Sequence, residues 1–295
     1  MKRELSILIP VFNYDCTALV RGLCQQAQQL EISYEVIVAE DGSTDNAALQ
    51  ANAEIALMPH CRYLLRRENI GRASIRNLLA RESSYTWLLF LDCDMELPGD
   101  HFIDSYLRCP AEEVVDGGFA VKENATLLHR NLRYTYEWSE QANHSAARRT
   151  ANPYRCFRTT NFLIRRDLML AHPFDERFRH YGYEDVLFGK HLKQAGIGIA
   201  HIDNSMVLTD VEPNSVFVAK TEESLRTLHQ FTDELRGYSH LLTVVNGIHV
   251  QPVKWAICLW HKLFGGILRR LLCGSHPSLR IFKLYKLGYF LTLKN

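Results

Sequence analysis

The stretch T-W-L-L-F-L-D-C-D at residues 86–94 decides the fold of this sequence. Residues 86–91 form an apolar run of strand length, and two aspartates, Asp92 and Asp94, follow it directly. A continuous apolar run between amphipathic helical segments is typical of a parallel sheet that is covered on both faces. In such sheets ligands bind at the carboxyl ends of the strands. The residues directly after each strand are therefore the first candidates for a functional site.

Strand and helix patterns alternate on both sides of this stretch. We expect strands at the apolar runs of residues 5–9, 34–39, 63–65, 114–121 and 157–164. Helical periodicity predicts helices over residues 15–30, 46–57, around 75–79 and over 184–195. Residues 127–155 show no clear period, and a loop is expected near 146–153. The sequence thus predicts an α/β fold with a mostly parallel central sheet and helices on both faces.

Charge is distributed unevenly along the chain. The formal net charge of the 295 residues is only +1, which gives no indication of nucleic-acid binding. After Glu234 there are nine Lys or Arg and no acidic residue, so the preceding part holds 25 basic and 33 acidic residues, a net charge of −8. This asymmetry predicts a separate role for the C-terminal segment.

The cysteines and the first residues bear on the compartment. The eight cysteines form no C-x-x-C pair, and several fall at apolar positions of predicted helices. Buried free thiols in a reducing compartment are the expected arrangement. The N-terminus runs directly into a predicted strand without the apolar core of a signal peptide, so a cytoplasmic location is expected.

Carboxylates stand at three of the predicted element ends: Glu40-Asp41, Asp92 with Asp94, and Glu184-Asp185 at a helix start. Because side chains alternate along an extended chain, Asp92 and Asp94 can point to one side and reach one site. Carboxylate oxygens suit Mg²⁺ or Mn²⁺, and such an ion stabilises a departing nucleoside diphosphate. A carboxylate at a helix start opposite the metal can serve as general base for an acceptor hydroxyl.

Five motifs in this order resemble those of family 2 glycosyltransferases. They are I-L-I-P-V-F-N at 7–13, E-D-G-S-T-D at 40–45, N-I-G-R-A at 69–73 with Arg76-Asn77, D-C-D at 92–94, and E-D at 184–185. The resemblance covers about residues 4–215. It implies the GT-A fold, a nucleotide-diphosphosugar donor, a divalent metal (Mn²⁺ or Mg²⁺) and an inverting single displacement.

The resemblance also implies roles for single residues. Donor binding is expected of Pro10, Phe12, Asn13, Asp41, Arg72, Arg76 and Asp92. Asp94 is expected as the principal metal ligand, with Asp92 at the ribose or the metal, and Asp185 as catalytic base beside Glu184. The sequence departs from the family where a histidine often completes the metal shell, because Leu208 occupies that place. His201 is then the candidate third ligand, and the alternative is a metal held by Asp94 and the donor phosphates alone.

Two basic segments near the C-terminus combine apolar, aromatic and cationic residues, at 255–272 and 279–293. Basic amphipathic helices of this kind usually lie in a membrane interface. We therefore expect residues 254–293 to bind a membrane surface, at the inner face of the plasma membrane. Packing of these helices on the catalytic domain or on a second subunit is the alternative. A membrane span is disfavoured by Lys262 near the centre of the first segment.

The expected domains are a catalytic domain at 1–235, with a nucleotide-sugar half at about 1–97 and an acceptor half at about 98–235, and a basic helical tail at 236–295. The expected function is sugar transfer to a carbohydrate or lipid-linked acceptor for polysaccharide or glycoconjugate synthesis. A nucleotidyltransferase would normally carry a Gly-rich loop where Pro10 to Asn13 stand, and a dehydrogenase is excluded because G-x-G-x-x-G is missing there. A non-catalytic binding protein of the same fold is the rival from another class.

Overall fold

The computed structural model describes residues 2–111 and 113–293. Its main sheet has seven strands in the order β3-β2-β1-β4-β8-β6-β9, and a smaller sheet has the order β5-β10-β7. The strands are β1 Glu4–Val11, β2 Ser33–Asp41, β3 Cys61–Arg66, β4 Trp87–Leu91, β5 Met95–Glu96, β6 Val114–Asp116, β7 Phe119–Val121, β8 Asn161–Arg165, β9 Ile199–His201 and β10 Met206–Leu208.

The central strands are parallel and buried. β1 pairs in parallel with β2 over its whole length and with β4 on its other side, and its residues from Leu5 to Ile9 are fully buried. Among the described strands of the main sheet, only β8 runs antiparallel to its neighbours, β4 and β6. The predicted α/β fold with a mostly parallel sheet is confirmed.

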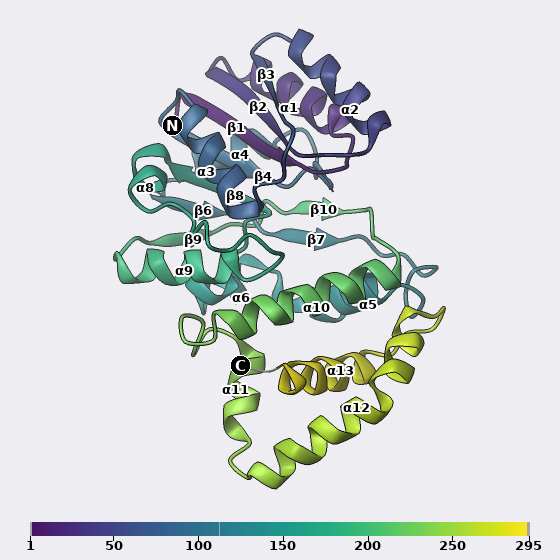
Figure 1. Ribbon diagram of the computed structural model, residues 1–295. Coiled ribbons are helices and arrows are strands. Elements are labelled where there is room, and N and C mark those ends of the chain that lie inside the picture. The colour runs from purple at the N-terminus through teal and green to yellow at the C-terminus, as the bar shows by residue number, and fades with distance from the viewer. Residues whose placement is uncertain (1, 112, 294–295) are drawn as a thin grey trace. The chain divides into compact units, whose positions relative to one another are not determined.

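Helices cover both faces of this sheet, because the order in which the chain forms its strands reverses direction across the sheet (Figure 1). From β1 the chain moves outward through β2 to β3 and then returns to β4 on the other side of β1. Since crossover connections are right-handed, the helix before β4 lies on the opposite face from those between β1 and β3. The strand order therefore switches between β1 and β4, and a ligand site is expected at their carboxyl ends.

The helices of the chain have the following bounds, with two short 3₁₀ helices among them. They are α1 Thr17–Gln29, α2 Asn46–Ala53, η1 Glu54–Leu57, α3 Arg72–Glu82, α4 Phe102–Arg108, α5 Leu132–Glu140, η2 Gln141–Asn143, α6 Ala146–Thr150, α7 Pro153–Cys156, α8 Arg166–Ala171, α9 Glu184–Gln194, α10 Asn214–Gln230, α11 His240–Gly247, α12 Gln251–Cys273 and α13 Leu279–Thr292.

Two expectations for the middle of the chain are wrong. The single strand expected over 114–121 is divided between β6 and β7, which belong to different sheets. Gly118 makes the break, because its φ of +73° is left-handed and its N–H donates to the Asp116 carboxylate at 2.7 Å. The region without clear period, 127–155, contains α5, α6 and α7 instead of a loop at 146–153.

The chain divides into two compact units that alternate along the sequence. The first comprises residues up to Lys122, Asn143–Arg179 and Phe188–Asp210, and it contains both sheets. The second comprises Glu123–Ala142, His180–Leu187 and the residues from Val211 onward. The predicted domain boundary at 235 stays a prediction.

The second unit is helical, and it includes the two basic helices that the sequence predicted. α12 and α13 pack on each other and on α10. Their shared core consists of Leu132, Val218, Leu272, Phe282 and Tyr285. Within the described residues, no helix has the length and apolar character needed to cross a membrane.

Candidate donor site and catalytic carboxylates

The ends of β1 and β2 are joined by Asn13. Its amide oxygen accepts N–H groups of Thr44 at 2.6 Å and Asp45 at 3.0 Å, and its own N–H donates to the Ser43 hydroxyl at 2.8 Å. Asn13 holds a left-handed φ of 53°, which asparagine tolerates better than most residues. Asn13 therefore organises the loops at the switch point, while the exposed ring of Phe12 next to it faces solvent (51% exposed).

Asp41 joins the end of β2 to the start of α3. Its two carboxylate oxygens accept the N–H groups of Ile70 at 2.7 Å and Gly71 at 3.1 Å. Burial raises the pKa of Asp41, and these hydrogen bonds together with the charge of Arg66 oppose that rise. Asp41 is thus fixed at the carboxyl edge of the sheet, where its role in donor binding stays a prediction.

Asp92 is held by two arginines of α3. Arg76 donates to one carboxylate oxygen at 2.6 Å, and the Arg72 guanidinium lies 3.5 Å from the other. The two arginines differ in exposure, because the Arg76 side chain is 1% exposed and that of Arg72 is 40% exposed. An aspartate with both oxygens engaged by arginines is better suited to orient a ligand than to bind a metal ion.

Asp94 belongs to a group of acidic side chains around Tyr14. Burial and then the charges of Asp210, Asp94, Cys93 and Glu96 raise the pKa of Tyr14 to about 12. Asp210 comes close because β10 runs antiparallel to β5, with Leu208 opposite Met95. Asp210 is therefore a carboxylate near Asp94 that sequence reasoning missed.

The same strand pairing also accounts for the leucine at position 208, where a histidine was expected. Leu208 is buried between the strands of the small sheet. His201 lies in the interior, where Nδ1 is 3.0 Å from the Arg149 guanidinium and 3.3 Å from an Asp116 carboxylate oxygen. Its Nε2 lies 3.0 Å from the carbonyl oxygen of Pro153. Both ring nitrogens are occupied within the protein, which contradicts the prediction that His201 is a metal ligand.

The residues that the structure describes contain no group of three or more His, Cys, Asp and Glu side chains placed to hold a metal ion. Two carboxylates near one another nevertheless fit Mg²⁺ or Mn²⁺ chemistry. Mg²⁺ is usually bound by one or two carboxylates together with substrate phosphates and waters, and not by a complete protein cage. Asp94 and Asp210 are hard oxygen donors of this kind.

Glu184 and Asp185 open α9 in the second unit. Glu184 is buried, and Asp185 is half-buried with one carboxylate oxygen accepting the N–H of Val186 at 2.8 Å. The preceding turn is unusual, because Gly182 and Tyr183 both have left-handed φ values, of 95° and 69°. The two carboxylates stand at a helix start, as the sequence predicted, and they follow a turn whose conformation the sequence did not predict. Their predicted roles stay predictions.

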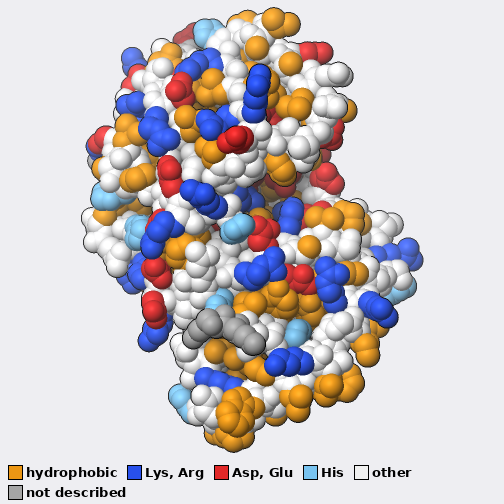
Figure 2. Space-filling model, in the orientation of Figure 1, with side chains coloured by type: hydrophobic (Ala, Val, Ile, Leu, Met, Phe, Trp, Pro, Cys, Tyr) orange, Lys and Arg blue, Asp and Glu red, His pale blue; other side chains and the backbone are white. Residues whose placement is uncertain are grey.

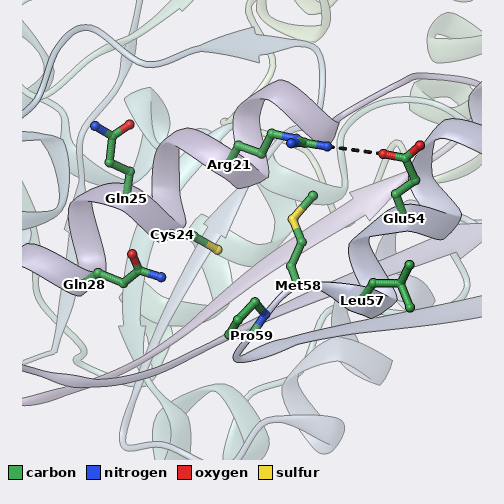
Figure 3. Close-up of a pocket in the computed structure, with 8 residues that line it drawn as sticks. All are labelled: Arg21, Cys24, Gln25, Gln28, Glu54, Leu57, Met58 and Pro59. Atoms are coloured by element: carbon green, nitrogen blue, oxygen red, sulfur yellow. Dashed lines mark hydrogen bonds and ion pairs between the residues drawn. The ribbon is translucent and has the colours of Figure 1, made fainter.

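A cavity of about 490 Å³ in the first unit lies apart from these residues (Figure 3). It is lined by Arg21, Cys24, Gln25, Gln28, Glu54, Leu57, Met58 and Pro59, and the Arg21–Glu54 ion pair spans one side of it at 3.2 Å. None of the predicted site residues lines it. This cavity is therefore separate from the predicted donor-binding residues.

Two solved structures share this fold. S. aureus TarS superposes with a TM-score of 0.51 and 14% identity, covering 98% of this chain and 90% of that one. The Pyrobaculum calidifontis mannosyltransferase PcManGT, solved with GDP-Man and Mn²⁺, gives a TM-score of 0.52 and 12% identity, covering 97% and 84%. At these identities the likeness shows the fold alone, and it is the GT-A fold that the sequence predicted.

The family follows from the sequence comparison. The chain belongs to glycosyl transferase family 2, whose profile matches residues 6–171, more than half of the chain. It is 27% identical over 245 residues to the chondroitin synthase of Escherichia coli, and 27% identical over 247 residues to the hyaluronan synthase of Pasteurella multocida. Each match covers 71% of this chain, but only 35% and 25% of those relatives, so the chain spans about a third of their length or less.

Proposed function

We propose that this glycosyltransferase moves a sugar from a nucleotide-diphosphosugar to the end of a carbohydrate acceptor, with inversion, in polysaccharide synthesis. The observation that carries the proposal is the convergence of Asp94 and Asp210 near Tyr14 at the carboxyl edge of the sheet. The similarity to chondroitin and hyaluronan synthases supports a carbohydrate acceptor. A lipid-linked acceptor stays the alternative.

The donor nucleotide would be bound by groups at the switch point. The exposed ring of Phe12 offers a face on which a base can stack. Asp41 ends β2 in the same loop cluster, because Asn13 ties the β1 and β2 ends together. Arg72 is partly exposed beside Asp92, so its guanidinium can pair with phosphate oxygens. Pro10 lies next to these groups, near the carboxyl end of β1 and opposite Ala39 of β2.

Mn²⁺ or Mg²⁺ would be held by Asp94 and Asp210 together with the diphosphate oxygens. When bound, the ion neutralises charge on the departing nucleoside diphosphate. Asp185 would take the proton of the acceptor hydroxyl, since its carboxylate is only half-buried. The more deeply buried Glu184 would orient the acceptor.

A thermal-shift screen of UDP, GDP, ADP and CDP, with and without Mn²⁺, tests the donor site. Stabilisation by one nucleotide that requires Mn²⁺ is expected, because a ligand that binds the folded state raises its melting temperature. No nucleotide-dependent shift would contradict the proposal. Binding without release of nucleoside diphosphate from any sugar donor would point to a non-catalytic binding protein.

Asp94→Ala should remove the Mn²⁺-dependent part of this stabilisation while leaving the melting temperature of the protein alone nearly unchanged. The reason is that Asp94 lies at a half-buried strand end and not in the core. Asp210→Asn should weaken the same effect. Asp233→Ala, which changes an exposed aspartate of the second unit, is the matched control. If nucleotide binds Asp94→Ala equally well with and without Mn²⁺, the metal assignment is wrong.

We also propose that α12 binds the surface of an anionic membrane, which would place the enzyme at the cytoplasmic face of the plasma membrane. Its exposed apolar residues recur every four positions, at Trp255, Leu259, Leu263, Ile267 and Leu271. Each successive pair at this spacing is adjacent on the helix surface, so these residues form a stripe that winds slowly across the exposed side of α12. Figure 2 shows hydrophobic side chains along the lower edge of the view, where Figure 1 places α12.

The charges near this face support a lipid surface as its partner. The segment after Glu234 contains nine basic and no acidic residues, and Lys262, Arg270, Arg280 and Lys283 are exposed. Cations beside an apolar stripe suit the headgroups of anionic lipids. The opposite side of α12 packs within the protein through His261, Gly265 and Leu272. One face of α12 thus packs within the protein, while the other face is exposed and can bind a membrane.

Leu259→Ser with Leu263→Ser should weaken binding of the full chain to phosphatidylglycerol vesicles by at least roughly tenfold, because burying one leucine stabilises by about 1.5–3 kcal/mol. Sedimentation with vesicles measures this binding, and high salt should weaken it further. Leu57→Ser is the control, since Leu57 is a strongly exposed leucine of the first unit, outside α12. Wild-type protein that stays in the supernatant with these vesicles would contradict membrane binding.

A further inference from the structure

One side of α10 is occupied by the turn that precedes the two catalytic carboxylates. Lys220, Glu223, Ser224 and Thr227 follow the spacing i, i+3, i+4, i+7, which places them along one face of the helix. Each of these residues contacts the turn at Tyr181 or Gly182. All of them belong to the second compact unit.

The contacts fix the backbone of Tyr181. The Tyr181 N–H donates to the Glu223 carboxylate at 3.2 Å, and the Thr227 hydroxyl donates to the Tyr181 carbonyl oxygen at 3.2 Å. Both main-chain polar groups of Tyr181 are therefore held by side chains of α10. The ammonium group of Lys220 lies 5.9 Å from the centre of the Tyr181 ring.

The turn needs such a restraint because its conformation is unfavourable. Gly182 has a φ of +95°, and a Cβ there would lie 2.7 Å from the Cβ of Ser224. Tyr183 follows with a φ of +69°, which a bulky side chain rarely adopts. Such backbone persists only where surrounding contacts hold it. The chain then runs directly into Glu184 and Asp185, so a shift of the turn moves both carboxylates.

The helix that holds the turn is itself held by the C-terminal helices. On another side of α10, Glu222 accepts the Tyr285 hydroxyl at 2.6 Å and the Arg269 guanidinium at 2.8 Å. Arg226 donates to the Tyr289 hydroxyl at 2.6 Å. These bonds tie α10 to α12 and α13, so α10 is a fixed support for the turn.

We propose that Glu223 and Thr227 are positioning residues, which hold the Tyr181–Tyr183 turn so that Asp185 stands where it can accept the acceptor proton. The inference rests on the proposed role of Asp185. A reacting group displaced by about 1 Å can lose roughly a hundredfold in rate. The turn residues that Glu223 and Thr227 bind, His180 and Tyr181, belong to the second unit. We therefore expect donor affinity not to depend on Glu223 or Thr227.

Paired variants separate positioning from simple loss of stability. Glu223→Ala and Thr227→Val remove the two hydrogen bonds, whereas Glu223→Gln and Thr227→Ser keep an acceptor and a hydroxyl at the same places. Hydrogen exchange of the amides in 180–187 reports the turn without any substrate. Release of nucleoside diphosphate from a panel of UDP- and GDP-sugars reports turnover, with Asp185→Asn measured alongside.

We expect the double variant Glu223→Ala/Thr227→Val to exchange the Tyr181 amide about tenfold faster or more and to lose roughly ten- to a hundredfold in turnover. Its affinity for the nucleoside diphosphate should be unchanged. The double variant Glu223→Gln/Thr227→Ser should stay near wild type in both measurements.

The outcomes distinguish this inference from the proposed function. Unchanged exchange at Tyr181, or faster exchange with normal turnover, overturns the positioning role while Asp185→Asn stays impaired. Equal losses in the conservative pair and the disruptive pair also overturn it. Normal turnover in Asp185→Asn instead removes the proposed base itself.

Discussion

Asp185→Asn should lower turnover by about 10²–10⁴-fold while leaving affinity for the nucleoside diphosphate almost unaltered, because that is the usual contribution of general-base catalysis. In a single displacement the acceptor oxygen attacks the anomeric carbon opposite the departing diphosphate. A sugar hydroxyl has too high a pKa to ionise unaided, so a carboxylate must accept its proton as the bond forms. Asparagine keeps the shape of the side chain and its hydrogen bond from Val186 but removes the basicity.

Glu184→Gln is the matched comparison, since it makes the same change of acid to amide one residue earlier. We expect a milder loss, because Glu184 is buried at the helix start and is better placed to orient than to exchange a proton. Steady-state turnover and isothermal titration with the nucleoside diphosphate separate the two effects. Near-normal turnover in Asp185→Asn would contradict the role of Asp185 as the general base, and Glu184 would then be the next candidate.

The core of the fold could be predicted from the sequence because local pattern and tertiary structure agree there. β1, β2 and β4 are apolar runs in the sequence, and in the structure they are buried on both faces of the sheet. The apolar run alone was therefore enough to predict each of these strands. The carboxyl-end rule then placed Asp41, Asp92 and Asp94 at one edge of the sheet, where the structure has them. The strand expected at 114–121 failed because the left-handed φ of Gly118 turns the chain out of the main sheet.

Asp210, a further carboxylate near Asp94, could not be assigned by motif alone. Leu208 stands at the position where the family often has a histidine. The strand that contains Leu208 is only three residues long, and it ends before Asp210. The same rule that found Asp94, a carboxylate shortly after an apolar run, would have found Asp210. Its proximity to Asp94 depends on the antiparallel pairing of β10 with β5, which lie more than a hundred residues apart.

His201 shows the opposite error. A histidine near an expected metal site suggested ligation, but the ring fills a buried network with Asp116 and Arg149. Nothing in the local sequence distinguishes a buried hydrogen-bonded histidine from a ligand. Arg149 lies in the region without clear period, 127–155, and its α6 helix is only five residues long, so tertiary contacts and not periodicity define it.

Arg76→Met should lower the free energy of unfolding by about 3 kcal/mol, at the lower end of the roughly 3–5 kcal/mol that follows when one partner of a buried ion pair is removed. Arg76 was expected to bind the donor, and in the structure its side chain is 1% exposed and donates to Asp92 at 2.6 Å. Methionine fills most of the volume of the arginine side chain, but it leaves the negative charge of the Asp92 carboxylate only partly compensated. The Arg72 guanidinium, which lies 3.5 Å from the other Asp92 oxygen, limits the loss of stability.

Arg72→Met is the matched control, because it makes the same substitution on the same helix against the same carboxylate. Arg72 is 40% exposed, so its loss should cost less than about 1 kcal/mol. Adding Asp92→Asn to Arg76→Met should restore part of the stability, since the uncompensated charge is then gone. Urea denaturation of the three variants measures these differences. Equal losses in Arg72→Met and Arg76→Met would show that burial of the Arg76–Asp92 pair does not stabilise the strand end that carries Asp94.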